Sequence, residues 1–165
     1  YTPVAWSNTK EILNNEQVHE LVLRATDGDV GRGRRVYLQA QCFSCHGGLQ
    51  DKQAAVFGPD LVGVTKRLKP EELADAIVYP SKQVAERFRP TTVATTDGVV
   101  YTGVLTERTD ERLVLVTLEN RVIRIPAADI DEVSMPETSF MPEKLLNRFN
   151  ETQVKDLLAF LRSLK

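Results

Sequence analysis

The chain has 165 residues and a formal net charge of −2; 42% of its residues are hydrophobic and 27% are charged. This composition is that of a soluble globular domain, and the near-neutral charge gives no reason to expect a nucleic-acid partner. No apolar stretch approaches the roughly 20 residues that a membrane-spanning helix needs. The two cysteines are too few for a disulfide framework. A zinc site would need carboxylates, because His19 is the only histidine outside the cysteine segment.

The first 28 residues are predicted to form a polar lead-in and one helix, as an N-terminal extension. Ser7 or Asn8 is the expected cap, and the apolar residues that follow have helical spacing: Ile12, Leu13, Val18, Leu21 and Val22. The segment lacks the charged start and long apolar run of a secretory leader. We therefore expect either that a leader has been removed or that the chain is a piece of a longer protein.

Two more helices are predicted in the first half of the chain, over Val30–Ala40 and residues 69–79. Proline at the first helical position favours the start of the second one, and Tyr79-Pro80 ends it, because the residue before a proline is pushed out of the helical region. Residues 49–69 between them are predicted mostly as loop, since glycine and proline interrupt this stretch.

From Thr91 to Val133 the sequence pattern changes from helical spacing to that of short β-strands. β-branched residues dominate the block, and Asp97-Gly98 and Glu119-Asn120 are typical hairpin turns. The predicted strands are Thr92–Thr96, Val99–Thr106, Arg112–Leu118, Arg121–Pro126 and Ile130–Val133. A final helix is expected over Glu151–Leu164, with Asn150 or Thr152 at its cap. The fold class is therefore α+β, mainly helical, with a small antiparallel sheet or barrel inserted before the last helix.

The motif Cys42-x-x-Cys45-His46 carries the chemistry of the chain, because it is the pattern of c-type haem attachment. Two thiols add to the two vinyl groups of one porphyrin, and the adjacent histidine reaches the iron. A redox-active dithiol would not need the histidine, and a metal knuckle would lack partners. We therefore expect one covalently bound haem c.

The residues around this motif resemble class I cytochromes c. Gly28 to Tyr37 is similar to the N-terminal helix of that family. The resemblance implies that Gly33 lets the last helix cross closely and that Tyr37 packs against it, with Leu157 and Phe160 at the contact. It also implies that the Pro59 carbonyl accepts a hydrogen bond from the haem-ligating His46, a contact that fixes the tautomer of the ligand.

A more specific resemblance begins at Gly58. The stretch through Leu73, Ile77 and Pro80-Ser81-Lys82 is similar to a haem-binding domain of planctomycetes and verrucomicrobia, which also has an apparent β-insertion and a Ser-x-Met-Pro segment. The order of the predicted elements, with strands between helices, divides the chain into three parts. They are an N-terminal extension (1–28), a haem domain (29–90 and 134–165) and an inserted β-subdomain (91–133), which also resembles a short Sm-like barrel.

Two methionines are candidates for the second axial ligand of the iron. Met135 and Met141 are each followed by Pro-Glu, and both precede the last helix, where class I cytochromes keep their axial methionine. Ser139-Phe140-Met141-Pro142 matches the family segment better, so Met141 is favoured; Met135 stays open, and His19 is the weakest candidate. With His46 and Met141 as metal ligands, the expected haem-binding residues are Cys42, Cys45, His46, Phe57, Pro59, Leu61, Leu73, Phe140 and Met141.

With both axial positions filled, no position is open for a substrate. The sequence therefore predicts outer-sphere transfer of single electrons and no enzymatic activity, in a carrier or in an electron-transfer domain of a larger dehydrogenase. A haem enzyme, or a gas or redox sensor with a labile sixth ligand, is the alternative. The expected partners are redox proteins, namely a donor dehydrogenase and an acceptor oxidase or cytochrome. The basic residues Lys52, Lys66, Arg67 and Lys69 could steer such a partner, and a plain solvated basic face is the alternative. Covalent attachment of haem implies a periplasmic or otherwise exported protein.

Overall fold

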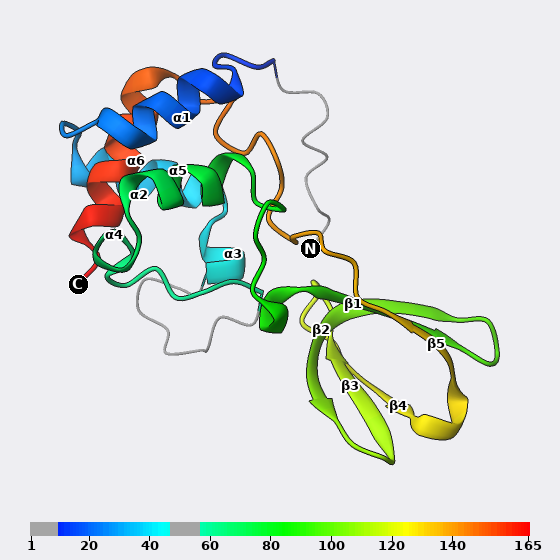
Figure 1. The fold of residues 1–165 in the computed structure, drawn as a ribbon. Helices are drawn as coiled ribbons and strands as arrows, with labels where there is room; N and C mark the ends of the chain where they lie inside the picture. Colours follow the sequence, from blue (N-terminus) through cyan, green and yellow to red (C-terminus); the bar gives the residue numbers. More distant parts are fainter. Residues whose placement is uncertain (1–9, 47–56) are drawn as a thin grey trace. The chain divides into compact units, whose positions relative to one another are not determined.

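The computed structural model describes residues 10–46 and 57–165. These residues divide into two compact units (Figure 1). One unit holds the described residues up to Lys82 together with Met141–Lys165, and is helical. The other unit is Gln83–Phe140, which extends beyond the expected insertion at both ends and contains the sheet. None of the described helices is long and apolar enough to cross a membrane.

The helical unit is built from short helices. They are α1 (Asn15–Arg24), α2 (Val30–Gln39), α3 (Phe43–His46), α4 (Val64–Arg67), α5 (Pro70–Val78) and α6 (Glu151–Ser163). Two of them begin at a capping box, in which an asparagine and a glutamine three residues later each accept a hydrogen bond from the other's backbone N–H. Asn14 and Gln17 form the box of α1, and Asn150 and Gln153 form that of α6.

Two predictions for the helices need correction. The cap of α1 is Asn14 and not Ser7 or Asn8, which lie outside the described residues. The predicted loop over residues 49–69 contains α4, and its part before Phe57 is likewise outside the described residues. The sequence signal for α4 is weak because a helix of one turn has no periodicity to detect.

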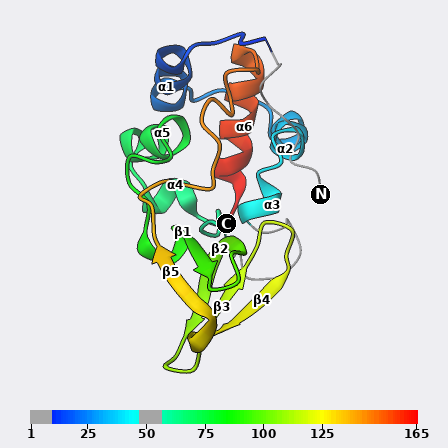
Figure 2. The same cartoon turned by 90° about the vertical axis from the view of Figure 1, so that its right-hand side faces the viewer.

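Helix α6 is the centre of the helical core. It packs against α2 on one side and against α1 on another, while α1 also packs along α5 (Figure 2). Val18 and Val22 of α1 are buried in the same apolar cluster as Leu157, Leu158 and Leu161 of α6. The first helix, which falls in the expected N-terminal extension, therefore packs into this core.

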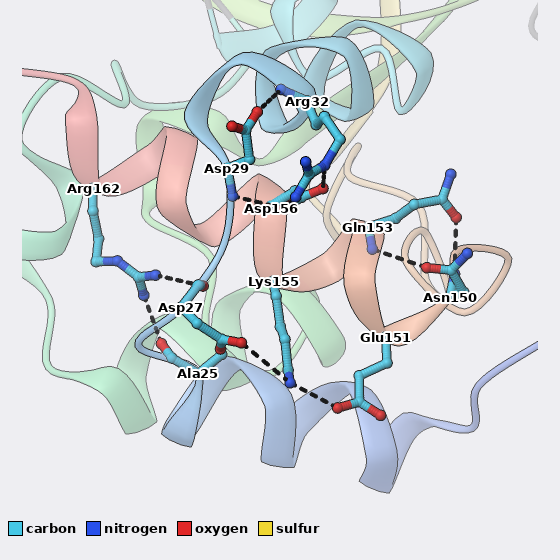
Figure 3. Close-up of polar contacts among 10 residues, drawn as sticks. All are labelled: Ala25, Asp27, Asp29, Arg32, Asn150, Glu151, Gln153, Lys155, Asp156 and Arg162. Carbon is cyan, nitrogen blue, oxygen red and sulfur yellow. Dashed lines mark hydrogen bonds and ion pairs between the residues drawn. The ribbon is translucent and has the colours of Figure 1, made fainter.

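The crossing of α2 and α6 is tight. A Cβ added at Gly33 would lie 1.9 Å from the backbone oxygen of Asp156, so only glycine fits there. One turn later the rings of Tyr37 and Phe160 meet at a centroid distance of 5.2 Å. At the same crossing Arg32 Nε donates to Asp156 Oδ2 at 2.6 Å, and the backbone N–H of Asp29 donates to Oδ1 at 2.7 Å (Figure 3).

The second unit contains a five-stranded antiparallel sheet in the order β4-β3-β2-β1-β5. Its strands are β1 (Pro90–Thr95), β2 (Val100–Arg108), β3 (Arg112–Val116), β4 (Val122–Pro126) and β5 (Ile130–Ser134). Both expected hairpin turns are present, with Gly98 and Asn120 at positive φ (85° and 58°). One face forms a separate apolar core around the fully buried Val93 and Leu115.

Candidate haem-attachment site

The cysteine motif begins at a sharp turn after α2. Gln41 adopts a left-handed backbone conformation (φ 56°), and the N–H of Cys42 donates to the carbonyl of Tyr37 at 3.2 Å. The chain then forms the single turn of α3, in which the N–H of His46 donates to the Cys42 carbonyl at 3.0 Å. Cysteines three residues apart on a helical turn lie on the same side of it. The turn thus presents both thiols together with the histidine.

Cys42 and Cys45 form no disulfide with each other. Burial raises the pKa of the Cys42 thiol to about 12 and also raises the pKa of Cys45. A reactive dithiol of the Cys-x-x-Cys type has a lowered thiol pKa, because the thiolate is the reactive species. The environment of Cys42 and Cys45 therefore disfavours a redox dithiol and fits sulfurs that are held in an apolar setting.

His46 has one ring nitrogen engaged by the backbone. Its Nδ1 lies 2.8 Å from the carbonyl oxygen of Pro59, which can only accept, so Nδ1 donates. Burial lowers the pKa of His46, against the opposing effect of this hydrogen bond. The imidazole is then neutral at neutral pH, with its lone pair on Nε2, which is the form that binds a metal ion.

Gly58 lies directly against the ring of His46. A Cβ added at Gly58 would be 2.7 Å from Cε1 and 2.9 Å from Nδ1 of His46. Real Cβ atoms do not approach ring atoms so closely, so this position requires glycine. The sequence marks Gly58 as part of a turn but does not reveal its contact with the ring.

The loop after Pro59 is held by polar contacts to the backbone. The N–H of Val62 donates to the side chain of Asp60 at 2.8 Å, and the Arg67 guanidinium donates to the carbonyls of both Asp60 and Val62. The N–H of Gly63 donates to the carbonyl of Leu164 at 2.9 Å, which ties the loop to the end of α6. Arg67 thus stabilises this loop. From the sequence it was expected only as part of a basic surface that steers a partner.

The other predicted haem-binding residues are distributed over both units. Leu73 is buried in the helical core and Leu61 packs against that core, while Phe57 is 8% exposed. Met141 is half-buried and begins the second segment of the helical unit, whereas Phe140 and Met135 fall in the sheet-containing unit.

His19, the weakest ligand candidate, is engaged elsewhere. Its Nε2 lies 3.1 Å from Asp75 Oδ1, so it pairs α1 with α5. Within residues 10–46 and 57–165, no three His, Cys, Asp or Glu side chains gather as they would for a metal ion. The donor set at α3, two thiols and one neutral imidazole, fits covalently attached haem, which brings its own four nitrogen ligands.

A helical unit with a Cys-x-x-Cys-His turn, and with the histidine fixed by a backbone carbonyl, defines the class of c-type haem-binding proteins. The cytochrome c family model matches residues 30–112, about half of the chain. The chain therefore belongs to the cytochrome c family. A comparison with curated proteins finds no match.

Membership in the family supports electron transport by covalently bound haem. The matched region includes Cys42, Cys45, His46 and Pro59, and it extends through β1 and β2. It ends at Arg112, before Met135, Met141 and α6. The family match thus covers the Cys-x-x-Cys-His motif and Pro59. It does not cover Met135 or Met141.

Proposed function

We propose that the protein is a single-haem c-type cytochrome that transfers one electron at a time between redox partner proteins. One haem follows from the single pair of cysteines. The observation that carries the proposal is the 2.8 Å contact between His46 Nδ1 and the Pro59 carbonyl. Because it holds Nε2 deprotonated, it prepares His46 as an axial ligand. When bound, the haem supplies an iron that takes up and releases a single electron.

The residues of the chain would hold and tune this group. Cys42 and Cys45 would attach it through thioether bonds, and His46 would bind the iron. Phe57, Leu61 and other apolar side chains such as Leu73 and Phe140 would exclude water from it, which affects its reduction potential.

Met141 is proposed as the sixth ligand of the iron. It belongs to the helical unit that also carries His46, whereas Met135 belongs to the sheet-containing unit. This division supports Met141 over Met135. His/Met ligation raises the reduction potential and leaves no open position, which suits outer-sphere electron transfer and not catalysis.

The finer relationships are also part of the proposal. The Ser-x-Met-Pro segment and the sheet before the last helix support kinship with the planctomycete and verrucomicrobial haem-binding domain. Attachment of haem c takes place outside the bacterial inner membrane, so we infer an exported, periplasmic protein. Its partners would be a donor dehydrogenase and an acceptor oxidase or cytochrome.

Visible spectra of the parent protein and two matched variants test this function. We expect a six-coordinate low-spin parent with the far-red sulfur-to-iron band, loss of that band in Met141→Ala, and its retention in Met135→Ala. Loss in Met135→Ala alone would assign the ligand to Met135. A high-spin parent, or one that binds cyanide at once, would show an open iron position and would favour an enzyme or a sensor.

A further inference from the structure

Arg148 lies in the segment between Met141 and α6, two residues before the cap Asn150. Its Nη2 donates to the backbone carbonyl of Gln39 at 2.6 Å. Its guanidinium carbon lies 4.8 Å from the ring centroid of Phe149. The side chain is half-buried. Arg148 thus connects the chain that follows Met141 to the end of α2.

The carbonyl of Gln39, which accepts this hydrogen bond, lies at the end of a helix. Gln39 is the last residue of α2, where carbonyls lack partners within the helix and the helix dipole favours a cation. Cys42 follows three residues later, after the turn at Gln41. A charge bound at the Gln39 carbonyl is therefore next to the point where the haem-attachment motif begins.

The guanidinium of Arg148 keeps its charge although the side chain is half-buried. Burial lowers the pKa of Arg148, yet arginine stays protonated at neutral pH because its ordinary value is so high. A permanent positive charge is thus held, partly out of water, at the end of α2, three residues before Cys42.

We propose that Arg148 is a positioning residue of the haem site, which ties the Met141 side of the chain to the end of α2 and places a fixed positive charge beside the Cys42 edge of the haem. This inference rests on the proposed function. Reduction adds one electron to the iron, drawn from the donor protein, and lowers the charge of the haem by one. A nearby cation favours the state with less positive charge, and more so where water is excluded. Arg148 therefore raises the reduction potential.

Redox titration of the haem-loaded protein tests the role of the charge. Arg148→Gln removes the charge, and Arg148→Met removes it while keeping an apolar contact with Phe149, so a second neutral variant is available if the first fails to fold. Arg148→Lys keeps the charge. We expect both neutral variants to have a lower potential than the parent, with the sulfur-to-iron band retained, and Arg148→Lys to stay close to the parent.

Arg162 provides the matched control. Its guanidinium also donates to backbone carbonyls, those of Ala25 at 2.7 Å and Asp27 at 3.3 Å, but it does so from the last turn of α6 (Figure 3). Arg162→Gln should leave the potential unchanged. The inference is overturned if the neutral Arg148 variants keep the potential of the parent, if Arg148→Lys falls as far as they do, or if Arg162→Gln falls equally. Failure of the proposed function would already be visible in the spectrum of the parent.

Discussion

The environment of His46 shows how single residues would prepare the proposed haem site. The Pro59 carbonyl fixes the proton on Nδ1, and Gly58 leaves the space that the ring occupies. The two residues are adjacent, so one short stretch of chain sets both the tautomer and the position of the imidazole. A change at Gly58 should therefore disturb the ligand without removing it.

Gly58→Ala is the substitution that tests this arrangement. The added methyl would lie within 3 Å of two ring atoms of His46, and overpacking of this kind costs about 1–3 kcal/mol. We expect weaker low-spin character in the visible spectrum and a lower thermal midpoint of the haem-loaded protein. Pro59→Ala keeps the accepting carbonyl and should change the spectrum much less. Equal spectra for the parent and Gly58→Ala would show that the ring does not need this space.

At the residue scale, the sequence predicts those site residues whose spacing is set by the chemistry of haem attachment. Thioether attachment and axial ligation need two cysteines and a histidine in one short motif, so Cys42, Cys45 and His46 can be proposed as the site without a structure. The contact of Gly58 with the ring and the contact of Arg148 with Gln39 depend on how distant parts of the chain meet. Local sequence patterns do not predict contacts between residues that are distant in the chain.

At the scale of elements, the crossing of α2 and α6 combines close packing with a buried charged side chain. The resemblance to class I cytochromes c predicts Gly33, Tyr37 and Phe160 at this crossing, and the structure places them there. The sequence does not predict the burial of Asp156, since acidic residues are almost always exposed. Asp156 is only 2% exposed, and its carboxylate accepts hydrogen bonds from Arg32 and from the backbone of Asp29.

Asp156→Asn should destabilise the helical unit in a pH-dependent way. The hydrogen bond from Arg32 holds the pKa of Asp156 below its ordinary value. A carboxyl group with a lowered pKa in the folded state contributes stability above its unfolded pKa of about 3.9, and that contribution is lost as the pH falls through the folded value. Loss of a buried charge-assisted hydrogen bond costs about 1–3 kcal/mol. We expect this deficit at pH 7 and a smaller one near pH 3.

Thermal unfolding followed by far-ultraviolet circular dichroism measures this difference. Glu71→Gln is the control, because Glu71 is an exposed acid in the first turn of α5. Its deficit should be small at both pH values. A gap between the parent and Asp156→Asn that stays constant from pH 7 to pH 3 would contradict the role assigned to the ionised carboxylate.

At the scale of the whole molecule, the chain maintains two separate apolar cores. The helical core is formed by residues that precede Gln83 or follow Phe140, and the sheet core lies around Val93 and Leu115. The hairpin turns and β-branched residues let the sequence predict the sheet. Its linear strand order depends on the pairing of β1 with β5, which are distant in the chain, and local pattern does not predict it.

The pairing of β1 with β5 makes the sheet removable. Thr92 lies opposite Ser134 in the antiparallel register, and paired Cα atoms of this kind are roughly 5 Å apart, so two or three Gly/Ser residues can replace residues 93–133. Because the helical core does not use these residues, we expect the shortened chain to attach haem and to keep its sulfur-to-iron band. Leu115→Ala in the full chain is the companion variant. It should cost the sheet core about 2–5 kcal/mol and leave the spectrum unchanged. A shortened chain without attached haem or helical dichroism would mean that the helical unit needs the sheet in order to fold.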